Sequence, residues 1–160
     1  MITTTDHGPY TIKSIKTWTG HEGMGGFSAT IYKNGKKIGT VLNNDDGGPN
    51  YWRFLDQKAS KSQDCVDLTA HARESVKPEH KDYCEVEDIW FIDVLGDYEE
   101  HKRLKRYCKK ETLMRFKDDK EGSFRRAKAI YSVRFHQEIL KMYGDKVEIV
   151  LDSNAEVATI

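Results

Sequence analysis

A two-residue turn in the N-terminal third constrains the fold most. Asn34 and Gly35 separate two runs of alternating residues, 27–33 and 36–42. Both turn residues tolerate the positive φ that a type I′ turn requires, so we expect an antiparallel β-hairpin. The register that this turn sets places Val41 on the outer face. It places five apolar residues together on the inner face: Phe27, Ala29, Ile31, Ile38 and Leu42.

Alternation, capping signals and helix stops predict the remaining elements. Further strands are expected at 10–19, 51–55 and 147–151, and a second hairpin at 112–117 and 124–131. Helices are expected within 57–80, where Pro78 would stop the helix, and at 97–110 and 132–143. The apolar run 89–92 fits either a buried helix turn or an inner strand, and Gly96 is a plausible break after it.

These elements predict an α+β fold in a single domain over residues 10–151. An antiparallel sheet built from the N-terminal and C-terminal hairpins would pack with two to four helices, although the sequence does not fix whether both hairpins share one sheet. Residues 1–9 are expected to form a mobile tail, and 152–160 a second tail.

Composition favours a globular, cytoplasmic protein. The 160 residues are 38% hydrophobic and 11% aromatic, which argues against disorder. No stretch approaches the roughly 18 continuous apolar residues of a membrane span, and the first residues lack the basic start and apolar segment of a signal peptide. Three widely spaced cysteines do not suggest a disulfide framework, so we expect a reduced compartment and no membrane partner.

Charge along the chain is separated into two blocks, although the formal net charge is zero. Residues 80–100 hold eight acids and one lysine, whereas residues 101–128 hold twelve Lys and Arg and four acids. A folded protein with such separation offers one preferred side to a polyanion or to an acidic protein surface. The acidic block could itself act as a phosphate-like surface.

The basic block supplies the candidate contact residues, which are interleaved with aromatic residues that can stack on bases. The predicted contact set is Arg103, Lys105, Arg106, Arg115, Lys117, Arg125, Arg126 and Lys128. The competing interpretation is a solvated face whose cations pair with the neighbouring acids, for example Glu99 with Arg103 at i,i+4.

No catalytic, metal or cofactor motif emerges. Cys65, His71, His80 and Cys84 lack the spacing of a zinc site, loop 43–48 fails the calcium template, and the glycines at 20–26 lack a P-loop lysine. We expect no cofactor and no metal.

Two other function classes stay open. The first is a small metal-dependent hydrolase or nuclease that uses His21, Glu22, Asp45 and Asp46. The second is a structural or regulatory module that forms homo-oligomers, in which the acidic surface of one copy meets the basic surface of the next.

Several segments resemble small uncharacterised proteins carried by phages and plasmids. They are 26–48, 112–117, the Phe124-Arg-Arg run and the Tyr143-Gly-Asp run, about half of the chain. The resemblance implies a context only: small accessory proteins of mobile elements often bind and block a host factor, including defence complexes. We therefore expect a non-enzymatic binding protein in the host cytoplasm, with a host protein, a nucleoprotein complex or a nucleic acid as its partner.

Overall fold

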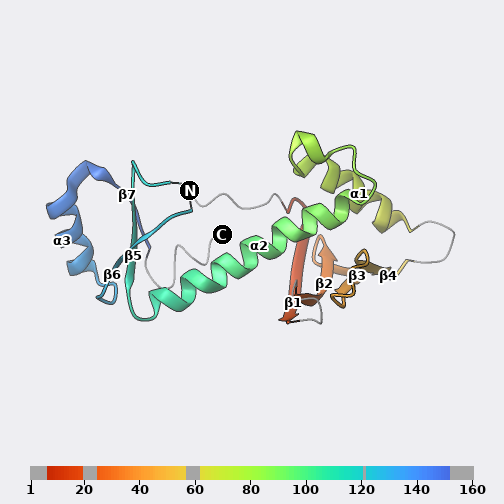
Figure 1. Cartoon of the computed structure of the whole chain (residues 1–160), viewed down its shortest axis with the longest axis horizontal. Helices are drawn as coiled ribbons and strands as arrows, with labels where there is room; N and C mark the ends of the chain where they lie inside the picture. Colours follow the sequence, from red (N-terminus) through yellow and green to blue (C-terminus); the bar gives the residue numbers. More distant parts are fainter. Residues whose placement is uncertain (1–6, 20–24, 57–61, 121, 152–160) are drawn as a thin grey trace. The chain divides into compact units, whose positions relative to one another are not determined.

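The computed structural model describes residues 7–19, 25–56, 62–120 and 122–151. The chain divides into two compact units, one of residues 5–94 and one of residues 95–160 together with 1–4. We call them the N-terminal and C-terminal units; Figure 1 shows the helices and strands of each, coloured along the sequence.

The N-terminal unit contains a four-stranded antiparallel sheet in the order β1-β2-β3-β4. Its strands are β1 (Tyr10–Trp18), β2 (Gly26–Lys33), β3 (Lys36–Asn43) and β4 (Tyr51–Phe54). The strands predicted at 10–19 and 51–55 and the first hairpin are therefore confirmed.

Asn34 and Gly35 form the predicted two-residue turn, with φ of 50° and 79°. A β-bulge follows, because Ile38 is an extra residue on β3 and Ile31 pairs with Gly39 instead. The predicted register is correct beside the turn and wrong beyond this point.

The bulge exchanges two residues between core and surface. Val41 is 1% exposed and belongs to the core, whereas Leu42, predicted to be buried, is 36% exposed. Gly39 explains why the chain shifts here: a Cβ at this position would lie 2.5 Å from the carbonyl oxygen of Arg53 on β4. The bulge places a residue without a side chain where β4 comes closest.

Helix α2 (Val86–Cys108) begins in the N-terminal unit, and its first turns pack on the sheet. Trp90 and Phe91 are fully buried. The ring of Phe91 lies 5.2 Å from that of Phe27, and the ring of Trp90 lies 6.0 Å from that of Tyr10. The apolar run 89–92 is therefore a helix turn that buries Trp90 and Phe91 but leaves Ile92 59% exposed.

The helices differ from their predicted bounds. Helix α1 (Gln63–Ser75) begins at the N-cap Ser62, and the short 3₁₀ helix η1 (Pro78–His80) follows it. Part of the predicted helix 57–80 falls on residues 57–61, outside the described chain. Helix α2 continues through Gly96, so the predicted break is wrong, since a glycine costs a helix only about 1 kcal/mol.

The C-terminal unit contains a second antiparallel sheet, in the order β6-β5-β7. It consists of β5 (Thr112–Phe116), β6 (Arg125–Ala127) and β7 (Val147–Leu151), with α3 (Val133–Tyr143) and the 3₁₀ helix η2 (Gly144–Lys146) between β6 and β7. Ser132 caps α3 and Gly144 ends it, as predicted. Both faces of β5 are buried: Leu113 packs with Leu104 of α2, and Met114 packs with Ile139 of α3.

The predicted α+β class is confirmed, and the two hairpins lie in two sheets rather than one. Residues 1–6 and 152–160 of the predicted tails lie outside the described residues. Pro9, the last residue of the predicted N-terminal tail, contacts the first hairpin, because its carbonyl oxygen accepts a hydrogen bond from Asn34 N–H at 2.8 Å. None of the described helices is long and apolar enough to cross a membrane.

Candidate basic interface

The eight predicted contact residues all belong to the C-terminal unit. They lie on α2 (Arg103, Lys105, Arg106), on β5 and just after it (Arg115, Lys117), and on β6 and just after it (Arg125, Arg126, Lys128). Four of the arginines bind carboxylates. The other four residues form no ion pair with any residue that the structure describes.

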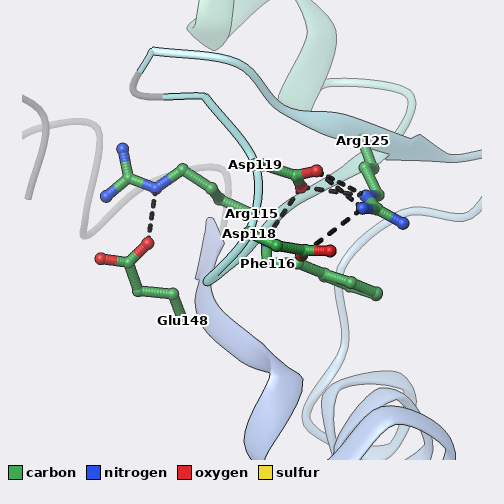
Figure 2. A network of polar contacts seen from close by, with 6 residues as sticks. All are labelled: Arg115, Phe116, Asp118, Asp119, Arg125 and Glu148. Atoms are coloured by element: carbon green, nitrogen blue, oxygen red, sulfur yellow. Dashed lines mark hydrogen bonds and ion pairs between the residues drawn. The ribbon is translucent and has the colours of Figure 1, made fainter.

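Arg115 is buried and stabilises the interior of its unit. It lies in the middle strand of the sheet, its side chain is 4% exposed, and its Nε donates to Glu148 Oε2 at 2.9 Å (Figure 2). Its guanidinium carbon lies 5.8 Å from the ring centre of Phe124. A partner cannot reach this side chain, so Arg115 leaves the contact set.

Arg125 is bound within its own hairpin. Its Nε and Nη2 donate to the carboxylate of Asp119 at 2.6–3.0 Å, and its guanidinium carbon lies 4.0 Å from the ring centre of Phe116 (Figure 2). Asp119 also accepts a hydrogen bond from Phe116 N–H at 2.9 Å. The bond from Arg125, followed by the one from this N–H, lowers the pKa of Asp119. Arg125 therefore stabilises the turn, and its charge is compensated.

Arg126 points to the opposite face of β6. Its Nη2 donates to Glu111 Oε1 at 2.8 Å, and its guanidinium carbon lies 4.5 Å from the ring centre of Tyr107. The hydrogen bond from Arg126 lowers the pKa of Glu111. This carboxylate lies 15 residues away in the sequence, so local charge spacing did not reveal the pair.

On α2 the predicted pair of Glu99 with Arg103 is replaced by two pairs at i,i+3. Arg103 Nη2 lies 2.6 Å from Glu100 Oε1, and Lys102 Nζ lies 3.5 Å from Glu99 Oε1. These pairs are at the surface, where an ion pair contributes little free energy.

One face of α2, which we call the basic face, presents four exposed cations: Lys102, which pairs with Glu99, and Lys105, Arg106 and Lys109. They follow one another at i, i+3, i+4 and i+7, so a helix presents them on one side. With Tyr98 and His101 they line a hollow of about 420 Å³. Two of these cations, Lys105 and Arg106, belong to the predicted contact set, and the other two were missed although their spacing was visible in the sequence.

His101 adds no positive charge to the basic face at neutral pH. Partial burial, and then the neighbouring Lys105, lower the pKa of its imidazole below the ordinary value of 6.5. The positive charge of this face therefore comes from lysine and arginine alone.

The acidic block that precedes the basic one is partly used for structure. Asp88 accepts hydrogen bonds from Asn50 N–H at 3.0 Å and from Trp52 Nε1 at 2.6 Å. Asp88 thereby fixes β4 and the loop before it to α2. A carboxylate engaged in this way is not available to imitate a phosphate for an external partner.

The structure gives no support to the hydrolase alternative. His21 and Glu22 lie outside the described residues. Asp45 is 4% exposed, and its Oδ2 has no hydrogen-bond partner among the described residues, whereas Asp46 Oδ1 accepts a bond from Gly48 N–H at 3.2 Å. Within the described ranges, no group of three or more His, Cys, Asp and Glu could hold a metal ion.

The cysteine and histidine residues weighed as zinc ligands have other surroundings. His71 packs against Tyr10, with 5.1 Å between the ring centres, and His80 packs against Tyr83 at 5.6 Å. Cys84 is an exposed free thiol. These contacts place the histidines as packing residues of the N-terminal unit.

No family model, curated protein or solved structure matches this chain.

Proposed function

We propose that this protein is a non-enzymatic binding protein whose basic face engages the phosphate backbone of a nucleic acid, free or within a host nucleoprotein complex. The observation that carries the proposal is the row of four exposed cations on the last turns of α2. Lysine and arginine side chains at such spacing neutralise phosphates and release counterions, which favours binding without sequence selectivity.

The dimensions of the basic face agree with this ligand. From Lys102 to Lys109 a helix rises about 10 Å, and phosphates on one strand of a duplex follow at about 3.4 Å along the axis. The face can therefore contact about three or four phosphates. Arg103 projects from another side of α2, Arg125 and Arg126 lie on β6, and Arg115 is buried, so none of them belongs to the basic face.

Salt dependence tests the proposal. Binding to a short fluorescent duplex, followed by anisotropy, should weaken as salt rises from about 50 to 200 mM. Four neutralised phosphates correspond to a slope of log K against log salt of about −3.6. A slope near zero, or no binding at low salt, would remove the nucleic acid as the ligand.

A charge-reversal pair locates the site. Lys105→Glu with Arg106→Glu should abolish binding, while the matched change Lys36→Glu with Lys37→Glu should retain most of it. The matched pair alters net charge equally on the exposed part of the first hairpin. Equal losses would show that binding depends on net charge and not on the basic face.

The mobile-element context rests on the resemblance of the hairpin segments to phage and plasmid proteins. In that context the bound nucleoprotein would be a host defence or nucleic-acid-processing complex, and binding would block it. Capture of such a complex from bacterial lysate should be lost with the Lys105→Glu, Arg106→Glu variant as bait. Its persistence with that bait would refute a role for the basic face.

A further inference from the structure

The C-terminal unit has a second hollow, of about 310 Å³, enclosed by α2, β5 and the segment that leads into β6. Its floor is apolar, since Leu104 and Leu113 line it and are 2% and 1% exposed. Tyr107 and Phe124 form its aromatic sides and pack on the same apolar cluster. The volume is at the lower end of the range of about 300–1,000 Å³ for ligand pockets.

Two arginines, Arg103 and Arg126, line this hollow. Glu111 binds Nε and Nη2 of Arg126, and Tyr107 lies beneath its plane at 4.5 Å, so the group is held on two sides. A guanidinium has five N–H donors, and a bidentate carboxylate uses two of them. Donors therefore remain for a second acceptor.

The charge around the hollow favours an anion. Arg126 and Lys128 both act on the carboxylate of Glu111, and both lower its pKa, Arg126 more strongly. Arg103 is paired with Glu100. Among these described side chains, the two lining arginines and Lys128 exceed their two partner carboxylates by one positive charge.

We propose that this hollow binds a nucleotide, with the base against Phe124 and the guanidinium plane of Arg126 and the phosphate beside Arg103 and Arg126. Bases stack readily on aromatic rings and on arginine planes, and arginine donors suit phosphate oxygens. Two ligands offer this combination of a planar ring and an anionic group: a free nucleotide, and an unstacked nucleotide of a single strand.

This site is separate from the basic face. At 100° per residue, the centre of Arg103, Leu104 and Tyr107 lies roughly opposite the centre of the basic face around the axis of α2. The proposal therefore goes beyond the function proposed above, and either can fail without the other.

Titration with adenosine 5′-monophosphate, followed by amide resonances of the ¹⁵N-labelled protein, tests the site. We expect saturable shifts at Gly122 and Ser123, which line the hollow. Adenosine and inorganic phosphate should each bind at least about tenfold more weakly, because each supplies half of the contacts. Absence of saturable shifts at these residues would overturn the proposal.

Two adjacent arginines provide a matched pair of variants. Arg126→Gln should weaken nucleotide binding about tenfold or more, since it removes charged hydrogen bonds. Arg125→Gln is the control: it removes the same charge from the neighbouring residue, whose side chain donates to Asp119. Nucleotide affinity should then stay within about twofold of the wild type. Phe124→Leu keeps an apolar contact but removes the ring, and it should also weaken binding. Equal effects of the two arginine variants, or an unchanged affinity of Phe124→Leu, would refute the site.

A decaadenylate distinguishes the two sources of the ligand. It is titrated into the Lys105→Glu, Arg106→Glu variant, so that the basic face does not contribute. Tighter binding than that of the mononucleotide, with shifts at the same amides, assigns the hollow to an unstacked base of a single strand. Weaker or equal binding assigns it to a free nucleotide.

Discussion

Arg115 donates a hydrogen bond to Glu148 at 2.9 Å, and this pair joins the middle strand β5 to β7 inside the C-terminal unit. Arg115 has 4% of its side chain exposed, whereas Glu148 has 42%. The Nη1 atom of Arg115 is buried and has no hydrogen-bond partner in the part of the chain that the structure describes. The arginine therefore depends on this carboxylate for much of its compensation.

Glu148→Ala should destabilise the C-terminal unit by about 1–3 kcal/mol, because it leaves a buried guanidinium unpaired. Replacing both partners, with Arg115→Met added, should restore stability to within about 1 kcal/mol of the wild type. Hydrogen exchange at the amides of Leu113 and Met114 measures the effect within β5. If the double variant is less stable than Glu148→Ala, the pair contributes net stability and our account of it is wrong.

Gly39→Ala should destabilise the N-terminal unit by about 1–3 kcal/mol, as overpacking does in well-packed interiors. The added Cβ would lie 2.5 Å from the carbonyl oxygen of Arg53, so β4 must move. Urea unfolding followed by tryptophan fluorescence measures the loss, since Trp18, Trp52 and Trp90 all belong to this unit. Gly96→Ala is the control: it meets no atom within 4 Å on an exposed helix turn, and it should not destabilise the protein.

The sequence predicted local features of the fold well and long-range ones poorly. The turn at Asn34 and Gly35 was predictable because it depends on two residues alone. The bulge was not, because it accompanies the close approach of β4 to Gly39, a contact between strands that alternation within one strand does not encode. The separation of the two hairpins into two sheets is likewise a tertiary property that alternation does not encode.

The same distinction applies to the candidate site. The row from Lys102 to Lys109 follows from helical spacing and could be found in the sequence. The pairing of Arg115 with Glu148 joins residues 33 apart on neighbouring strands, and that of Arg126 with Glu111 joins residues 15 apart. Counting charges in a block therefore overstated the contact set.

Acid should destabilise the turn between β5 and β6, in which Asp119 accepts hydrogen bonds from Phe116 N–H and Arg125. The pKa of this carboxyl is lowered in the folded protein, mainly by the hydrogen bond from Arg125. Its contribution is therefore fully present above the ordinary value of 3.8 and is lost as the pH falls through the lower, folded value. The amide resonance of Phe116, which donates to Asp119, should report this titration below pH 3.8.

Asp119→Asn should remove most of that acid-dependent change. Asp118→Asn is the matched control, since Asp118 is 81% exposed and lies 3.8 Å from Arg125. A titration of the Phe116 amide centred above pH 3.8, or one that Asp118→Asn abolishes, would contradict the assignment of this role to Asp119.

Glu99→Gln should strengthen binding to a duplex about two- to threefold, because it removes the negative charge beside Lys102 and so raises the charge of the basic face by one. Glu100→Gln changes net charge equally but acts on Arg103, on the flank of α2 away from that face. It should alter affinity less. Anisotropy titrations at low salt compare the two variants. An equal gain in affinity in both would mean that duplex binding depends on total charge and that the basic face is not the contact surface.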